Sequence, residues 1–258
     1  MNDRPILSGR GLAKYYGARA GCLDINIDLF PAEVLAIVGE SGSGKSTLLG
    51  LLSTHLAKSS GALSYTRADG VTLNLDTMSE MERRLLLRTE WGFVQQDARM
   101  GLRMKVSAGG NVGERLMAVG WRHYGDIRQE AQDWLARVEI SADRMEETPS
   151  SFSGGMRQRL QIARNMVTRP RLIFMDEPTG GLDVSVQARF LDLLRGLVAD
   201  NRLSVILVTH DLAVARLLAH RIAVMREGRI VELGLADQVL EDPQHAYTQL
   251  LVSSVLQA

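Results

Sequence analysis

The chain has 258 residues, of which 45% are hydrophobic, so it can bury a large core as one α/β domain or as a core with an inserted subdomain. Its 30 basic and 30 acidic residues cancel, which argues against a protein that wraps a nucleic-acid backbone. The sequence has neither an uncharged apolar run of the roughly 18 residues that span a membrane nor an apolar secretory signal near its start. We therefore expect a cytoplasmic protein with no direct membrane insertion and no nucleic-acid partner, in which the single cysteine, Cys22, is a small buried hydrophobe.

Three apolar runs, at residues 34–38, 172–175 and 205–208, are too continuous for strands that have one face in water. They predict strands of a parallel sheet that is covered on both faces. Each run leads into a polar or glycine-rich turn and then into a helical pattern. This alternation is typical of an α/β fold, in which ligands bind at the carboxyl ends of the strands.

The segment from about Ser79 to Val167 differs, because it has helical periodicity and little strand signal. We interpret most of it as a helical subdomain inserted into the sheet domain. Its glycine-rich stretch VSAGGNVG, residues 106–113, is expected to form a flexible entry to one of the helices.

The first chemical motif is GESGSGKS, from Gly39 to Ser46, which has the spacing of a phosphate-binding loop. Glycines let successive backbone N–H groups turn inward toward an anion, and the helix that follows adds its partly positive end. Lys45 would reach the β and γ phosphates of a nucleotide, and the Ser46 hydroxyl would ligate Mg²⁺. An apolar strand before the motif and an apolar helix after it make a chance match improbable.

The second motif is LIFMDEP, in which a buried strand delivers two adjacent carboxylates at its carboxyl end. This places Asp176 toward the metal and Glu177 one residue further out, where it can orient a water molecule. By itself, an Asp-Glu-Pro triplet is more often a solvated turn. The phosphate-binding loop elsewhere in the chain favours the functional interpretation.

The third motif is SFSGGMRQR, in which Ser153 resembles a helix N-cap and Gly154 and Gly155 leave backbone N–H groups exposed. It is a second anion-binding element in a chain that already has one. Two such elements on the same nucleotide would be redundant. We therefore infer that the second one serves a nucleotide held by another subunit.

The order of these motifs, together with FVQQD, GGLD and VTHD, resembles that of the ATP-binding cassette ATPases over essentially the whole chain. The resemblance implies one cassette domain over residues 1–258, of the α/β class. Its RecA-like parallel-sheet core would cover about 1–95 and 168–258, with an N-terminal antiparallel β subdomain, and its inserted helical subdomain would cover about 96–167. The implied activity is hydrolysis of ATP with Mg²⁺, in a head-to-tail homodimer or in a heterodimer with a second cassette protein.

The resemblance also implies roles for individual residues. Lys45, Gln96, Glu177 and His210 would be catalytic, with Glu177 as general base, His210 at the γ phosphate and Gln96 near the attacking water. Mg²⁺ would be held by Ser46, Gln96 and Asp176. The adenine would stack on Tyr16, and Ser153, Gly154 and Gly155 would close over ATP of the partner subunit. The phosphates would lie against Gly39, Ser41, Gly42, Ser43, Gly44, Lys45, Ser46 and Thr47.

Two of these assignments have a neighbour as competitor. Tyr15 competes with Tyr16 for the adenine, and either ring could belong to the core. Gln95 competes with Gln96, but the adjoining Asp97 favours Gln96, because the family usually has Gln-Asp in this loop.

The motifs depart from the common family pattern at two places. Phe152 stands where Leu is common, and this should be tolerated because the anion contacts come from the Ser and Gly groups that follow. Gly180 and Gly181 replace a Ser-Ala pair in a loop that links the two ATP sites of a dimer. The second departure puts in doubt the coupling between the two ATP sites of the dimer, more than it puts in doubt the binding of ATP.

Within the family, four stretches closely resemble the cassette subunit of bacterial carbon-phosphorus lyase systems. They are RTEWGFVQQ, VSAGGNVGERLMAVGWRHYGDIR, EPTGGLDVSVQAR and LLVSSVLQA. The resemblance implies an ATPase that acts on a lyase core complex in the breakdown of phosphonates. Because cassette ATPases receive their partner just after the glutamine loop, Met104 to Tyr124 is the expected docking face. The alternative for this segment is an ordinary solvated loop and helix.

Two other functions remain open. The C-terminal DPQHAYTQLLVSSV resembles the ATPases of oligopeptide and nickel importers, which would dock on membrane permeases. A module that dimerises on ATP with little turnover is permitted by the glycine pair at Gly180 and Gly181, whereas Glu177 and His210 argue against it.

Overall fold

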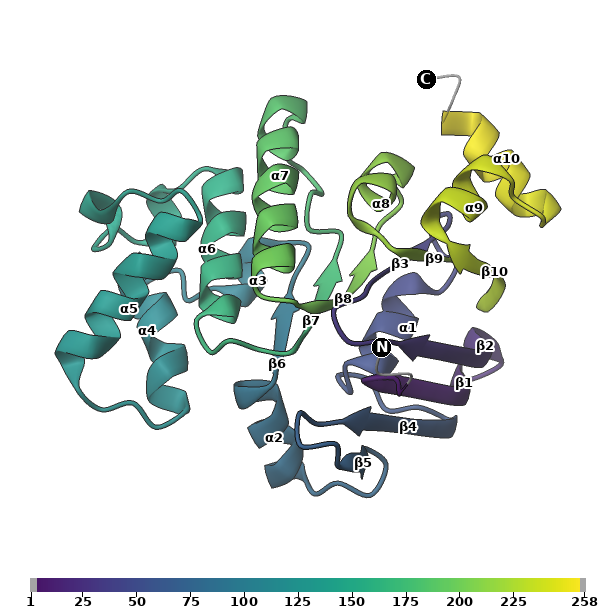
Figure 1. Ribbon diagram of the computed structural model, residues 1–258, viewed down its shortest axis with the longest axis horizontal. Coiled ribbons are helices and arrows are strands. Elements are labelled where there is room, and N and C mark those ends of the chain that lie inside the picture. Colours follow the sequence, from purple (N-terminus) through teal and green to yellow (C-terminus); the bar gives the residue numbers. More distant parts are fainter. Residues whose placement is uncertain (1–3, 256–258) are drawn as a thin grey trace. The chain divides into compact units, whose positions relative to one another are not determined.

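The structure is a computed structural model, and it describes residues 4–255. The last three residues of the stretch LLVSSVLQA and the first three of the chain lie outside the described residues. Two compact units are present. The first contains residues up to Glu80 and from Arg202 onward, and the second runs from Met81 to Asn201 (Figure 1).

An antiparallel sheet forms the N-terminal part of the first unit. Its strands are β1 (Leu7–Tyr16), β2 (Arg19–Leu29), β4 (Ser60–Thr66) and β5 (Thr72–Asn74), in the order β2-β1-β4-β5. Every pairing is antiparallel. The Tyr16–Arg19 hairpin turns at Gly17, whose φ of 61° is easily adopted by glycine. Cys22 lies fully buried on β2, as expected.

The strands that carry the first candidate motif form a second sheet of this unit. They are β3 (Val34–Val38), β8 (Ser204–Val208), β9 (Arg221–Arg226) and β10 (Arg229–Leu235), in the order β10-β9-β3-β8. β3 pairs in parallel with β8 and with β9, and β9 and β10 form a hairpin. β3 and β8 are buried along their whole length, which confirms the two strands expected from continuous apolar runs.

Helices of the first unit are α1 (Lys45–Leu52), α8 (Leu212–Leu218), α9 (Ala236–Glu241) and α10 (Ala246–Val255). The last three cover the face of β3 and β9 that carries Ala36, Val38, Ile222 and Val224. This packing buries the strand that leads into the phosphate-loop motif, so the position of the motif is fixed by the core.

The second unit is mainly helical around two parallel strands, β6 (Trp91–Val94) and β7 (Leu172–Asp176). Its helices are α2 (Glu80–Thr89), α3 (Ala98–Gly101), α4 (Ala108–Ala118), α5 (Tyr124–Arg137), α6 (Gly154–Met166) and α7 (Val184–Asp200), with short 3₁₀ turns at Ala142–Arg144 and Pro149–Ser151. Trp91 and Phe174 pack edge to face across the strand pair, 5.1 Å between ring centroids. The sequence patterns do not distinguish β6, which is only four residues long.

The glycine-rich stretch at residues 106–113 is not a flexible entry, so that expectation is wrong. It forms the first turns of α4, which Ser107 caps by accepting a hydrogen bond from the N–H of Gly110 at 3.2 Å. A Cβ on Gly109 would lie 2.6 Å from Met145 Cε, and one on Gly113 would lie 2.8 Å from Ile127 Cγ2. The glycines are there because α4 packs closely against neighbouring chain, and this packing outweighs their low helix propensity.

The expected α/β class is confirmed, with an antiparallel sheet near the N-terminus, parallel strands and a helical region within residues 96–167. The exact boundaries of the core and the helical subdomain stay a prediction. No helix within residues 4–255 is long and apolar enough to cross a membrane.

Candidate nucleotide-binding site

The phosphate-loop motif folds as a tight turn between β3 and α1. Gly39, Gly42 and Gly44 have φ values of 148°, 82° and 105°, which are strained for any residue with a Cβ. A Cβ on Gly39 would lie 2.3 Å from the carbonyl oxygen of Met225, and one on Gly44 would lie 2.4 Å from that of Gly21. Gly42 is exposed, and a Cβ there would contact nothing within 4 Å. The loop is therefore packed closely at both ends and open at its middle, as a phosphate cradle requires.

Lys45 lies at the start of α1 and is almost completely buried. Its Nζ donates hydrogen bonds to the carbonyl oxygens of Gly39 at 2.7 Å and Glu40 at 2.9 Å, so the ammonium group lies inside the turn. No side chain caps α1, which leaves its first N–H groups for an anion. Ser46 is exposed beside Lys45, where its hydroxyl can ligate a metal ion held at the phosphates.

The Tyr16 side chain lies beside this helix end. A Cβ placed on Gly21 would be 2.8 Å from Tyr16 Cε2 and 3.0 Å from Thr47 Cγ2, so the ring and Thr47 flank the same glycine. The ring is half exposed, and Lys14 Nζ lies 5.4 Å from its centroid. Because successive residues of a strand point to opposite faces, Tyr15 points to the other face of β1. This geometry favours Tyr16 over Tyr15 as the adenine platform.

His210 follows β8 by two residues. Since β8 is parallel to β3 and pairs Val208 with Ile37, His210 and the phosphate loop leave the sheet at the same end. Asp211 donates its N–H to Thr209 Oγ1 at 3.0 Å and caps α8 through its carboxylate. These two contacts fix the turn and leave His210 exposed between them.

The carboxylate motif and the glutamine loop meet in the second unit. β6 and β7 are parallel and pair Val94 with Met175, so Gln96, two residues beyond Val94, and Glu177, two residues beyond Met175, lie at the same end of the strand pair. A Cβ on Gly180 would lie 3.4 Å from Gln96 Nε2, which shows that the Gln96 side chain lies against the turn after Glu177. Glu177 has a φ of 41°, a left-handed conformation that is uncommon for glutamate.

Gln95 has a different environment, which the sequence patterns do not reveal. Its N–H donates to Gln161 Oε1 at 2.7 Å, and its carbonyl accepts from Gln161 Nε2 at 3.0 Å. Asn165 forms the same two-way pair with the backbone of Phe93, at 3.0 Å in both directions. Two side-chain amides of α6 thus complete the hydrogen bonding of β6 in place of a further strand. The sequence feature that could have indicated this arrangement is the helical spacing of three amide side chains, Gln158, Gln161 and Asn165, all of which are buried in the structure.

The serine-glycine motif begins α6. Ser153 is the N-cap, and its hydroxyl accepts a hydrogen bond from the N–H of Met156 at 3.3 Å. Gly154 is exposed, whereas Gly155 is buried, and a Cβ on Gly155 would lie 2.6 Å from Val186 Cγ1. Phe152 is buried with the Arg144 guanidinium 4.9 Å from its ring, so the aromatic replacement of the common leucine is accommodated inside the unit.

The GGLD loop also has a local reason for its glycines. Gly181 has a φ of 76°, which only glycine adopts without strain, and Gly180 lies against the Gln96 side chain. A Cβ at position 180 would lie 3.2 Å from the Glu177 carbonyl oxygen and would contact the Gln96 side chain. The unusual pair therefore changes the surroundings of Gln96 as well as the flexibility of the loop.

The candidate residues fall into two groups, one in each unit. The phosphate loop, Tyr16 and His210 belong to the first unit, and Gln96, Asp176, Glu177 and the motif at Ser153 belong to the second. In each group, residues lie at the carboxyl ends of parallel strands, where α/β folds bind ligands, whereas Tyr16 ends an antiparallel strand and Ser153 begins α6. A family model described as ABC transporter matches residues 22–180, which include motifs from both groups. The chain belongs to this family of ATP-binding cassettes.

Individual relatives agree with this assignment. The phosphonates utilization ATP-binding protein PhnK of Escherichia coli (strain K12) is 61% identical over 255 residues, which cover 99% of each chain. A peptide import ATP-binding protein of Brucella ovis is 34% identical over 99% of this chain and 80% of its own.

Among solved structures, the dimeric cassette MJ0796, in a post-hydrolysis state bound to ADP and Pi, matches with a TM-score of 0.79 and 26% identity, over 89% of this chain and 98% of that one. The chain cbiO1 from Clostridium perfringens matches with a TM-score of 0.80 and 28% identity, over 93% and 92%. The chain is thus an ATP-binding cassette ATPase, as the motif order implied.

Proposed function

We propose that the chain is the cytoplasmic ATPase subunit of a carbon-phosphorus lyase system and that it drives conformational change of the lyase core during phosphonate breakdown. The observation that carries this proposal is the 61% identity with PhnK over 99% of both chains. At 61% over 255 residues, the identical positions far outnumber the residues of the nucleotide motifs.

The residues of the two groups divide the chemistry between them. The Lys45 ammonium and the free N–H groups of α1 bind the β and γ phosphates, and Tyr16 holds the adenine. Bound Mg²⁺ would neutralise charge on the phosphates, and its ligands would be Ser46, Gln96 and Asp176. The Glu177 carboxylate takes a proton from the attacking water.

Two further groups act on the γ phosphate. His210 donates a hydrogen bond to its oxygens, and Gln96 orients the water that Glu177 deprotonates. Both residues follow the end of a strand, where a side chain can reach a ligand bound beyond the sheet.

Dimerisation supplies the remaining contacts. Ser153, Gly154 and Gly155 present the start of α6 to an anion, and we propose that this anion is ATP bound to a second cassette. The proposal is supported by the dimeric state of MJ0796. Whether the second cassette is a copy of this chain or a different protein depends on the partners present in the cell.

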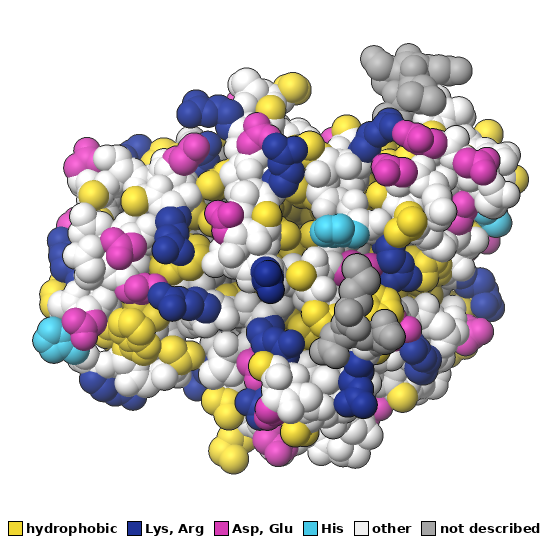
Figure 2. Space-filling view, viewed as in Figure 1, with side chains coloured by type: hydrophobic (Ala, Val, Ile, Leu, Met, Phe, Trp, Pro, Cys, Tyr) yellow, Lys and Arg dark blue, Asp and Glu magenta, His cyan; other side chains and the backbone are white. Residues whose placement is uncertain are grey.

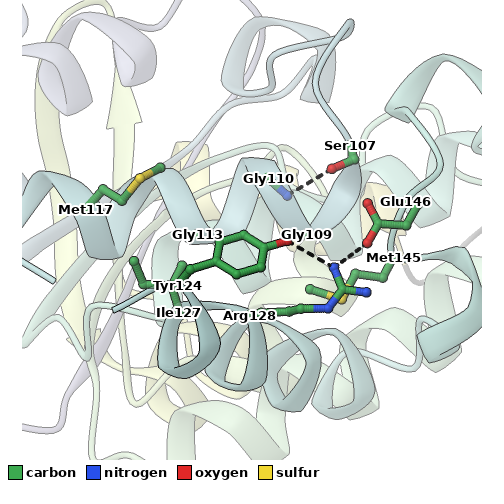
Figure 3. Close-up of a pocket in the computed structure, with 10 residues that line it drawn as sticks. All are labelled: Ser107, Gly109, Gly110, Gly113, Met117, Tyr124, Ile127, Arg128, Met145 and Glu146. Carbon is green, nitrogen blue, oxygen red and sulfur yellow. Dashed lines mark hydrogen bonds and ion pairs between the residues drawn. The ribbon is translucent and has the colours of Figure 1, made fainter. Parts of the chain in front are cut away.

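The proposed docking face, Met104 to Tyr124, contributes to a cavity of about 240 Å³ between α4 and α5. In Figure 3 the Tyr124 ring lies along this cavity with its hydroxyl toward Arg128, which donates to it at 3.5 Å and forms an ion pair with Glu146. Met117, which lines the cavity, is 49% exposed, and Trp121, which follows the end of α4, is 40% exposed. Figure 2 shows hydrophobic side chains gathered at the left of the view, where Figure 1 places α4 and α5. An apolar surface on the segment that follows the glutamine loop in the chain is suited to receive a protein partner.

The test is affinity purification of tagged Glu177→Gln protein with ATP from phosphate-starved cells, followed by identification of the proteins that copurify. Soluble lyase subunits should appear and should be lost when Met117 and Trp121 are changed to Asp. Changing Leu250, which is exposed on α10, to Asp is the matched control and should retain them. Failure to recover lyase subunits with the parent protein would overturn the proposal.

The second candidate is the ATPase subunit of a peptide or nickel importer. It is favoured by the 34% identity with the Brucella ovis peptide import protein and by the C-terminal sequence. In the same experiment, permease subunits from the membrane fraction would identify this function instead.

A further inference from the structure

The C-terminal segment from Asp242 to Val255 carries a sequence pattern that ATP chemistry does not explain, and the structure ties it firmly to the first unit. The Glu232 carboxylate accepts hydrogen bonds from the N–H groups of Gln244 at 2.8 Å and His245 at 3.0 Å. His245 Nδ1 in turn accepts from the N–H of Tyr247 at 3.1 Å. The start of α10 is therefore held by three directional contacts.

These contacts direct Tyr247 into the core and toward the phosphate loop. The side chain is 6% exposed and packs with Val38, the last residue of β3. Its hydroxyl accepts a hydrogen bond from the backbone N–H of Glu40 at 3.1 Å. Glu40 is the second residue of the loop, so α10 contacts the loop where it leaves the strand.

The β9–β10 hairpin holds the other end of the loop. The Gly228 N–H donates to the carbonyl oxygen of Ser43 at 2.8 Å, and its own carbonyl accepts from Leu23 N–H at 2.8 Å. Gly228 has a φ of 80°. Arg226, two residues earlier, lies with its guanidinium 5.1 Å from the centre of the Tyr247 ring. The hairpin and α10 are thus connected to each other as well as to the loop.

We propose that Tyr247 is a positioning residue for nucleotide binding, which acts by holding the Glu40 end of the phosphate loop while Gly228 holds the Ser43 end. Phosphate binding requires several N–H groups to converge, and a loop fixed at both ends has little conformational entropy left to lose. The Tyr247 hydroxyl makes no contact with the ligand in this arrangement, and it acts through the Glu40 backbone. The C-terminal sequence pattern thereby acquires a role in ATP affinity.

The decisive variant is Tyr247→Phe, which removes the hydroxyl and keeps the ring against Val38 and Arg226. The dissociation constant for ATP with Mg²⁺, measured by calorimetry in the Glu177→Gln background, should rise about threefold to tenfold, the equivalent of about 1 kcal/mol. In otherwise unaltered protein the KM for ATP should rise similarly while kcat stays unchanged. Hydrogen exchange at the Glu40 amide should become faster, because its acceptor is gone.

The matched control is Thr248→Val, which removes a hydroxyl from the next residue of α10, also fully buried. It changes a buried side chain of α10 but keeps the hydrogen bond between Tyr247 and Glu40, and it should leave the dissociation constant for ATP unchanged. The proposal is overturned if Tyr247→Phe changes that constant by less than twofold, or if Thr248→Val weakens binding equally. An unfolding midpoint for each variant separates loss of the hydrogen bond from loss of the fold.

Discussion

The side-chain amide of Gln161 and the backbone of Gln95 form a closed pair of hydrogen bonds, one accepted at 2.7 Å and one donated at 3.0 Å. Gln161 is fully buried, and a Cβ on Gly101 would lie 2.1 Å from its Oε1, so the amide occupies space that only a glycine leaves. The pair joins α6, which begins with the motif at Ser153, to the residue before Gln96. The position of Gln96 is therefore tied, through the preceding residue, to the helix that begins with the motif at Ser153.

Replacement of Gln161 by Leu should destabilise the protein by about 2–4 kcal/mol. The leucine fills the same space but leaves the partly buried N–H of Gln95 without its acceptor, and the Gln95 carbonyl keeps only the hydrogen bond that Gln158 Nε2 donates at 3.3 Å. The measurement is chemical denaturation of the variant beside Gln129→Leu, an exposed glutamine of α5 that should be nearly neutral. Equal stability of the two variants would contradict the role assigned to the pair.

Replacement of Glu177 by Gln should lower the rate of ATP hydrolysis by about a hundredfold or more, because a positioned general base is lost. The dissociation constant for ATP should stay within a few fold, since the phosphate loop is unchanged. Phosphate release under saturating ATP measures the rate, and Glu227→Gln at an exposed hairpin is the control. Hydrolysis at the parent rate would remove Glu177 from the mechanism.

Replacement of Lys45 by Ala should weaken binding of ATP about tenfold to a hundredfold, because the buried ammonium that faces the loop carbonyls is lost. Equilibrium binding is the appropriate measurement, since hydrolysis alone would not separate affinity from rate. Lys58→Ala, at an ion pair with Asp76 on the antiparallel sheet, should bind like the parent. Undiminished affinity in the Lys45 variant would contradict the phosphate-loop assignment.

Tyr16 and Tyr15 provide their own matched comparison, because both are half exposed and adjacent in sequence. Tyr16→Ala should weaken ATP binding about fivefold to a hundredfold through the loss of stacking on the base, whereas Tyr15→Ala should not. Binding of inorganic triphosphate, which has no base, should be equal in both variants. If Tyr15→Ala gave the larger loss for ATP, the adenine platform would be the other ring.

Burial raises the pKa of the Cys22 thiol to about 12. The Cys22 Sγ lies 3.6 Å from the carbonyl oxygen of Gly44. The reactive thiolate is therefore scarce at ordinary pH in the folded protein. At pH 8.5, alkylation by iodoacetamide should be about a thousandfold slower than in the unfolded chain, whose thiol pKa is about 8.5. The rate in the folded state should rise with pH up to about 12. Mass spectrometry of samples quenched over time measures both rates, and equal rates would contradict this environment for Cys22.

Local sequence patterns predicted most of the candidate nucleotide-binding residues. A glycine-rich loop between an apolar strand and an apolar helix, and a carboxylate pair after another apolar strand, can be recognised because each depends on residues that are adjacent in the chain. The strands at residues 34–38, 172–175 and 205–208 were predicted correctly for the same reason, since burial on both faces leaves a continuous apolar run.

Patterns that depend on distant residues were missed. The glycines of α4 suggest a loop by propensity, yet Met145 and Ile127 require them inside a helix. β6 is too short to have a period, and part of its hydrogen bonding comes from Asn165, more than seventy residues further along the chain. The residues that pack against the glycines of α4 or bond to β6 lie elsewhere in the chain, so the local sequence of these two elements does not reveal the contacts.

The sequence by itself thus determined the loop, the carboxylates and the strands that carry them, because short-range sterics and backbone donors fix those features locally. Only the tertiary structure decided that the Tyr16 ring lies beside Gly21, that Gln161 holds Gln95, and that Tyr247 holds Glu40. Each of these is a contact between elements far apart in the chain, and its geometry is set by how whole strands and helices pack around a shared core.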